Sequence, residues 1–158
     1  MPKMDSIDSK ILEVLQADGR TTNHDLADQV GLSDSPCLRR VRKLEENDII
    51  TRYVALVDPD TVGLSVNAFV RVRLERQDDH HLVGFERTIR EYPEVMECYL
   101  MSGEADYQLR ILVSSLSDFE DFLRKKLTKI VGVSNVTTSF ALRPVVYRTA
   151  LPVNRLGR

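Results

Sequence analysis

The chain has little cysteine, and its cysteines are not clustered. Only Cys37 and Cys98 occur among 158 residues, and neither belongs to a C-x-x-C pair. This arrangement argues against a disulfide framework and against a thiolate zinc site. We therefore expect two free thiols in a reducing compartment.

The sequence also lacks any apolar run that approaches the length of a membrane span. Residues 1–5 lead directly into a charged, periodic stretch, without the apolar core of a signal peptide. These absences predict a cytoplasmic protein that makes no membrane contact.

An excess of positive charge is missing as well. The 22 Lys and Arg residues against 24 Asp and Glu give a formal net charge of −2, which offers no bulk attraction to nucleic acid. Any basic surface must therefore be local. Residues 1–64 hold 8 basic and 12 acidic residues, whereas residues 65–158 hold 14 and 12. The spacing of apolar residues changes from helical periodicity to alternation near Asp58-Pro59-Asp60. We therefore predict domains at 1–52 and 65–158, with a linker strand and turn at 53–64.

No catalytic constellation can be recognised from spacing. The chain shows no Gly-rich phosphate loop, no Ser/His/Asp arrangement and no paired buried carboxylates. His80 and His81 are adjacent, and neighbours on a helix diverge by about 100°, so we do not expect them to face one metal. We predict a protein that is not an enzyme and has no metal or cofactor site.

Helical periodicity predicts three helices in the first domain. Asp5 caps the first helix, which ends at Asp18-Gly19, and Thr22 with Asp25 approximates a capping box for a second helix that ends at Gly31. Ser33 or Ser35 caps the third, with Pro36 in its first turn. The buried stripes are Ile7, Ile11, Leu12 and Leu15, then Leu26, Ala27 and Val30, then Cys37, Val41 and Leu44.

The third helix carries a local basic face. With the apolar stripe turned inward, Arg39 and Arg42 point away from the core, while Arg40 and Lys43 lie on one shoulder. Taken alone, the helix fits equally a solvated face whose charges pair with Glu45 and Glu46.

The three-helix context favours DNA, because two helices joined around a glycine and followed by an arginine-rich helix form a helix-turn-helix reader. The extended segment 49–57 then forms a wing or a linker strand. The residues expected to contact double-stranded DNA are Thr22, Asn23, Ser33, Ser35, Pro36, Arg39, Arg40, Arg42 and Lys43.

Period-two alternation dominates the second domain. It predicts strands at 66–74, 95–101, 107–113 and 136–142. One helix carries Leu82, Phe85 and Ile89, and a second begins at Ser117 and stops near Gly132. The order β-α-β-β-α-β predicts an α+β, ferredoxin-like fold, an antiparallel sheet with both helices on one face, behind a winged-helix-like first domain.

That arrangement leaves the second face of the sheet uncovered. Phe69, Leu100 and Leu112 are expected there, and a partner sheet would cover them, so we expect a homodimer. The segment 145–147 is expected to add a strand to the sheet of the same or a neighbouring subunit.

An ordered set of short motifs runs through the whole chain. It comprises Ile7-Asp8, Ile11-Leu12, residues 15–20, 30–33, 36–45 and 49–50, then Glu97-Cys98-Tyr99-Leu100 and residues 102–107. In this set the chain resembles the leucine-responsive/asparagine-type (Lrp/AsnC, feast/famine) transcriptional regulators of bacteria and archaea over nearly its whole length. The resemblance implies a DNA-reading first domain and a second domain that binds an amino acid. It also implies dimers joined through that second domain, which often assemble to octamers.

The resemblance places the effector at the turn between the second and third strands. Gly103 permits a tight turn with exposed N–H groups, and Asp106 could accept a hydrogen bond from an ammonium group. The residues alone favour a plain strand connection capped by Asp106, and the resemblance favours the effector site instead. Apolar neighbours favour leucine or methionine. The expected effector-binding residues are Leu100, Met101, Ser102, Gly103, Glu104, Ala105, Asp106, Thr137, Thr138 and Ser139.

One alternative function stays open from the sequence. Small ferredoxin-like dimers also serve as amino-acid-binding regulatory subunits or as small enzymes that never contact DNA. Sequence-dependent retardation of DNA in a gel distinguishes a DNA-binding regulator, which shows it, from a subunit or enzyme without DNA contact, which does not.

Overall fold

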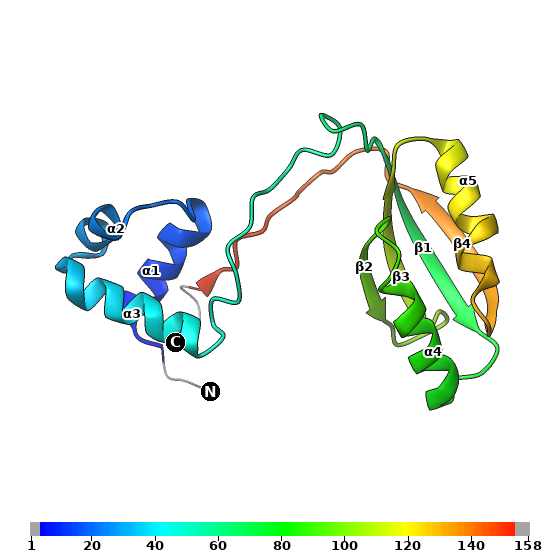
Figure 1. Ribbon diagram of the computed structural model, residues 1–158, viewed down its shortest axis with the longest axis horizontal. Helices are drawn as coiled ribbons and strands as arrows, with labels where there is room; N and C mark the ends of the chain where they lie inside the picture. The colour runs from blue at the N-terminus through cyan, green and yellow to red at the C-terminus, as the bar shows by residue number, and fades with distance from the viewer. Residues whose placement is uncertain (1–3, 154–158) are drawn as a thin grey trace. The chain divides into compact units, whose positions relative to one another are not determined.

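The computed structural model describes residues 4–153, which form two compact units (Figure 1). The first unit contains residues 4–56 together with 146–153, and the second contains residues 57–145. Among the described residues, no helix is long and apolar enough to cross a membrane.

The first unit contains three helices, α1 (Ser6–Ala17), α2 (Asn23–Val30) and α3 (Asp34–Glu46). The expected caps are confirmed for the first two: the Asp5 carboxylate accepts the N–H groups of Ile7 and Asp8, and the Thr22 hydroxyl accepts that of Asp25. Ser33, not Ser35, holds the cap position of α3, although its side chain makes no capping bond. The predicted apolar stripes form the core, in which Ile11, Leu26 and Cys37 are almost fully buried.

The end of the described chain returns to this helical unit. Val153 is 7% exposed and packs in the same core as Ile11. The Gln16 side-chain amide donates to the Leu151 carbonyl at 3.1 Å and accepts the Leu151 N–H at 2.6 Å. The expected division placed this segment in the second domain, because no periodicity in 146–153 reveals an apolar contact with residues so far away in the chain.

Two segments expected to be strands have no regular secondary structure. Residues 51–58 and 145–147 make no strand pairing within the described chain. Their apolar side chains are largely exposed, with Val54 and Leu56 both at 63%. A β-rich composition alone does not make a strand when no neighbouring strand supplies hydrogen bonds.

The second unit has the predicted β-α-β-β-α-β order. Its elements are β1 (Val66–Leu74), α4 (Asp79–Ile89), β2 (Val95–Leu100), β3 (Tyr107–Val113), α5 (Leu116–Lys125), the 3₁₀ turn η1 (Leu127–Lys129) and β4 (Val133–Phe140). The sheet order is β2-β3-β1-β4, and all neighbours are antiparallel. Ser115 rather than Ser117 caps α5, because its hydroxyl accepts the Asp118 N–H. β4 begins three residues before the expected strand.

One face of this sheet is covered by both helices, as Figure 1 shows. Alternate residues of β1, from Ala68 to Leu74, are buried against Phe85 of α4 and Phe122 of α5. On the opposite face, hereafter the open face, Phe69 is 40% exposed.

Two residues expected on the open face behave differently. Leu100 pairs with the core residue Tyr107, so its side chain lies at the edge of the helix-covered face, although it is 63% exposed. Leu112 is only 8% exposed. Alternation indicates which residues of a strand share a face, but not which of the two faces meets the helices, nor how far other residues bury the open face.

Candidate nucleic-acid interface and ligand site

The outer face of α3 is a surface of exposed cations, hereafter the basic face, made by Arg39, Arg42 and Lys43. Cys37 and Leu44 lie buried on the other side of the helix, as the angular pattern predicts. Among residues 4–153, no ion pair engages these three cations. Pairing with Glu45 and Glu46, the alternative left open by the sequence, is therefore not observed. Glu45 instead accepts a hydrogen bond from the Tyr53 hydroxyl at 3.0 Å.

Arg40 differs from its neighbours because its charge is paired inside the unit. Its Nη1 donates to Asp5 Oδ2 at 2.8 Å and to Asp8 Oδ1 at 2.7 Å. These bonds raise the pKa of Arg40, and the Asp8 N–H together with the Arg40 guanidinium lowers the pKa of Asp5. Arg40 thus joins α3 to the start of α1, a contact across more than 30 residues that helical phase cannot reveal.

The starts of α2 and α3 are also joined. Asn23 Nδ2 donates to the Asp34 carbonyl at 2.9 Å, and His24 Nδ1 lies 3.1 Å from Asp34 Oδ1, which raises the pKa of His24. Thr22 is held by its reciprocal contact with Asp25. At the start of α3, Ser33 and Ser35 are exposed and Pro36 is half-buried. The expected contact residues therefore lie along α3 and at the adjoining start of α2.

The turn between β2 and β3, residues 101–106, is hereafter the effector loop. It reverses at Gly103, whose φ of 127° lies in the region that favours glycine. Met101 N–H donates to the Asp106 carbonyl at 2.8 Å, and Arg73 Nε of β1 donates to the Glu104 carbonyl at 2.8 Å. Within the described chain, no hydrogen bond engages the backbone N–H groups of residues 102–105. The loop therefore offers a row of free donors.

Asp106 is buried, at 5% exposure, beneath this loop. Its carboxylate accepts the Leu74 N–H and the Gln77 side-chain amide, both at 2.6 Å, and its own N–H donates to the Val72 carbonyl at 2.9 Å. The carboxylate therefore fixes the loop to the end of β1. This role is similar to the alternative in which Asp106 caps the strand connection and does not contact a ligand. Sequence reasoning missed Arg73 and Gln77; the outward alternation of Arg71 and Arg73 on β1 was the available signal for the former.

The expected residues of β4 do not join the loop within one chain. β1 and β3 lie between β4 and β2, and neighbouring strands are about 4.8 Å apart. Thr137 and Ser139 pair with Arg71 and Phe69 on the open face, whereas Thr138 pairs with Val70 on the helix-covered face. Leu100 and Met101 are exposed beside the loop, at 63% and 45%. A single chain thus gathers the loop residues but not the hydroxyl groups.

Two family models together match most of the chain. A winged helix-turn-helix DNA-binding model matches residues 4–51, and an Lrp/AsnC ligand-binding domain model matches residues 67–151. The first match contains α1 to α3 with the basic face, and the second contains the sheet with the effector loop.

Similar proteins have been characterised in bacteria. The chain is 44% identical to the Bkd operon transcriptional regulator of Pseudomonas aeruginosa, covering 97% of this chain and 100% of that protein. It is 43% identical to the leucine-responsive regulatory protein of Rhizobium meliloti, covering 90% and 92%. Among solved structures, a transcriptional regulator of Neisseria meningitidis in complex with L-Met matches with a TM-score of 0.93 and 39% identity, covering 98% and 99%.

These relatives are regulators rather than enzymes, which removes the alternative of a small ferredoxin-like enzyme or a subunit without DNA contact. The basic face, the effector loop and the family matches agree over both units. The chain belongs to the Lrp/AsnC family of transcriptional regulators, with a helix-turn-helix DNA-binding unit followed by a ligand-binding domain.

Proposed function

We propose that α3 enters the major groove of double-stranded DNA and that Arg39, Arg42 and Lys43 make the contacts. The observation that carries this proposal is the basic face: three exposed cations, unpaired within residues 4–153, in a part of the chain that is otherwise acidic. Arginine side chains on such a helix bond guanine edges or phosphates. Arg40 acts here as a positioning residue, since Asp5 and Asp8 hold its guanidinium. The other expected contact residues stand at the starts of α2 and α3, and we assign them to the flanking phosphates: Thr22, Asn23, Ser33, Ser35 and Pro36.

The second part of the proposal is a homodimer built on the open face of the sheet, with further assembly to an octamer. Phe69 and Tyr99, at 40% and 56% exposure, would be covered by a second copy. A two-fold axis would then present two reader helices to a palindrome-like site, and several dimers could wrap DNA.

The third part is an uncharged amino acid, methionine or leucine, as the effector. The free N–H groups of the effector loop suit a carboxylate, and the exposed side chains of Leu100 and Met101 suit an apolar side chain. Because Asp106 is fixed to β1, the exposed carboxylate of Glu104 is the better acceptor for the ammonium group. The hydroxyl groups of Thr137 and Ser139 reach the ligand only if a second subunit brings them. The Neisseria relative that carries L-Met supports this choice.

DNA binding tests the first part. The full chain, titrated onto a labelled fragment from the region upstream of its own gene, should retard it saturably in an electrophoretic assay. A scrambled fragment of equal length should compete poorly. Equal retardation of both fragments, or none, would contradict sequence-specific regulation by a cytoplasmic protein of this kind.

The effector and the assembly are tested together. Calorimetry with the common amino acids should give heat with methionine or leucine and none with aspartate or lysine. Light scattering with and without the bound amino acid should then reveal whether the ligand shifts the oligomer, since a ligand shifts an equilibrium only through differential affinity. A monomer at micromolar concentration in both conditions would refute the dimer.

A further inference from the structure

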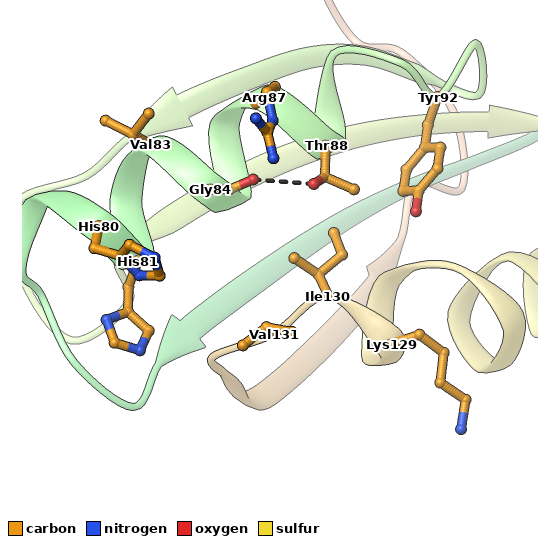
Figure 2. Close-up of a pocket in the computed structure, with 10 residues that line it drawn as sticks. All are labelled: His80, His81, Val83, Gly84, Arg87, Thr88, Tyr92, Lys129, Ile130 and Val131. Carbon is orange, nitrogen blue, oxygen red and sulfur yellow. Dashed lines mark hydrogen bonds between the residues drawn. The ribbon is translucent and has the colours of Figure 1, made fainter.

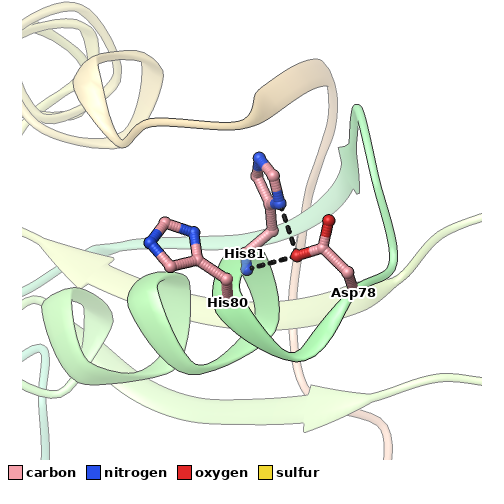
Figure 3. Close-up of side chains that lie close together, drawn as sticks. All are labelled: Asp78, His80 and His81. Atoms are coloured by element: carbon pink, nitrogen blue, oxygen red, sulfur yellow. Dashed lines mark hydrogen bonds and ion pairs between the residues drawn. The ribbon is translucent and has the colours of Figure 1, made fainter.

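Three potential metal ligands meet at the start of α4. Asp78, His80 and His81 each offer one ligand atom, and these atoms all lie within 4.8 Å of one another (Figure 3). Among the described residues, this is the cluster of histidine and carboxylate side chains with metal-ligand spacing. We call it the Asp-His-His cluster.

Two of the three ligands are already close together. His81 Nδ1 lies 2.6 Å from Asp78 Oδ1, and the same oxygen accepts the His81 backbone N–H at 3.0 Å. Two ligands on one zinc ion lie roughly 3.0–3.4 Å apart when each bond is about 2.1 Å long. An ion can therefore enter by a small opening of this pair, displacing the proton that the nitrogen and the oxygen share.

His81 is also held in place from behind. Its side chain is 20% exposed and packs on Gly132, where an added Cβ would lie 2.7 Å from His81 Cδ2. The Gly132 carbonyl in turn accepts the Glu75 N–H at 2.7 Å, which fixes this glycine against the end of β1. The imidazole thus rests on backbone and keeps its orientation without a metal.

His80 supplies the exposed ligand. Its ring centroid lies 5.5 Å from that of His81. By helical phase alone, adjacent residues on a helix diverge by about 100° and are not expected to share an ion. Helical phase describes backbone directions only. The side chains bring one ligand atom of each residue within 4.8 Å of the other two, although in Figure 3 only His81 faces Asp78 and the His80 ring points away from it.

The remaining coordination positions face open space. His80 and His81 stand at one end of a pocket of about 510 Å³ between α4 and residues 129–131 (Figure 2). Water molecules can therefore complete the coordination shell. The nearest cation on α4 within this lining, Arg87, is about 10 Å farther along the helix axis from His80, so it does not oppose a bound ion directly. The neighbouring Asp79 adds negative charge.

We propose that the Asp-His-His cluster binds a divalent transition metal ion of the zinc class. Two imidazoles and one carboxylate suit zinc, nickel or copper, whereas calcium and magnesium prefer all-oxygen sites. The site has three ligands: the Asp78–His81 pair is already formed, Gly132 supports the His81 ring, and His80 is exposed beside them.

Calorimetry with Zn²⁺ on the full, untagged chain tests this site. We expect about one Zn²⁺ per chain, and we expect His80→Ala and Asp78→Ala each to weaken binding about tenfold or more. His24→Ala is the matched control, because His24 also lies beside two carboxylates, Asp28 and Asp34, but has no second histidine. His80 is exposed, so its replacement leaves the fold intact. Absence of Zn²⁺ binding by the wild type, or loss of binding in His24→Ala alone, would overturn the proposal.

Nitrogen NMR of the side chains gives a readout that does not depend on any variant. The sequence holds only three histidines, so three imidazole spin systems are expected. Zn²⁺ should shift the ring nitrogens of His80 and His81 and leave those of His24 unchanged. A shift confined to His24, or no shift at all, would place the ion elsewhere and contradict the site.

Discussion

The sequence predicts that the basic face of α3 and the effector loop are both binding surfaces, yet the two present different chemical groups to a ligand. On α3, regular helical spacing leaves Arg39, Arg42 and Lys43 exposed, and one cation, Arg40, is paired inside the unit. In the effector loop the charged Asp106 is buried, and the backbone N–H groups are the part left free. A helix thus offers side chains to a ligand, whereas this loop offers its backbone.

This difference has a common physical origin. Arg40 and Asp106 are both among the expected ligand contacts, and in this structure each makes charge-assisted hydrogen bonds with an element distant in sequence. A charged side chain within reach of such partners is held by them. Its replacement should therefore affect folding first and binding second, while its exposed neighbours should show the reverse.

The largest expected effect is that of Asp106→Ala. The substitution leaves the Leu74 N–H and the Gln77 amide without their acceptor, in a buried position. We expect the free energy of unfolding of the second unit to fall by about 3 kcal/mol, because bonds to charged groups and unsatisfied buried donors are both costly. Urea unfolding, monitored through the amide NMR signals of β1, measures this free energy. A loss of methionine binding with unchanged unfolding would restore Asp106 as a ligand contact.

Glu104→Gln should show the opposite behaviour. Its exposed carboxylate makes no hydrogen bond within the described residues, and only its carbonyl is held, by Arg73. We expect methionine affinity to fall about tenfold, which corresponds to about 1.4 kcal/mol, with little change in unfolding. Calorimetry gives the affinity. Unchanged affinity would show that the ammonium group of the ligand is accepted elsewhere.

The smallest expected effect concerns the pairing of Arg40 with Asp5 and depends on pH. The pKa of Asp5 is lowered in the folded chain, so its carboxylate adds stability at neutral pH that is lost as pH falls through the lowered pKa, below about pH 4. Asp5→Asn keeps a capping side chain but removes the charge. We expect it to cost about 0.5 kcal/mol at pH 7, since the pair is partly exposed, and progressively less as pH falls through the lowered pKa of Asp5.

Hydrogen exchange of the α1 amides in wild type and Asp5→Asn measures this difference. Asp5→Ala serves as the control, because it also removes the cap and should cost about 1 kcal/mol more. A cost for Asp5→Asn that stays constant down to pH 2 would contradict the role of the charge.

The fold could be predicted largely from the sequence because its elements are periodic. The apolar stripes of α1, α2 and α3, which contain Ile11, Leu26 and Cys37, and the alternation from Ala68 to Leu74 each place a whole face in the core. What could not be predicted depends on contacts between distant segments. Val153 packs in the helical core, and Asp106 accepts the Leu74 N–H, although nothing local in either segment indicates a partner. The helical phase of His80 and His81 likewise carries no information about side-chain reach, which brings a ligand atom of each within 4.8 Å of a carboxylate oxygen of Asp78.

The salt dependence of DNA affinity tests the central account most directly. We expect Arg39→Ala and Arg42→Ala each to weaken DNA binding. Where the arginine contacts a base, the loss should be about 1–3 kcal/mol and the sequence preference should relax. Where it contacts a phosphate, the slope of log affinity against log salt concentration should fall by about one unit. Lys10→Ala is the matched control, because it removes an equal charge from an exposed position of α1. The account predicts that Lys10→Ala leaves affinity and slope unchanged. Equal losses in all three folded variants, or none in the arginine variants, would contradict DNA recognition by the basic face of α3.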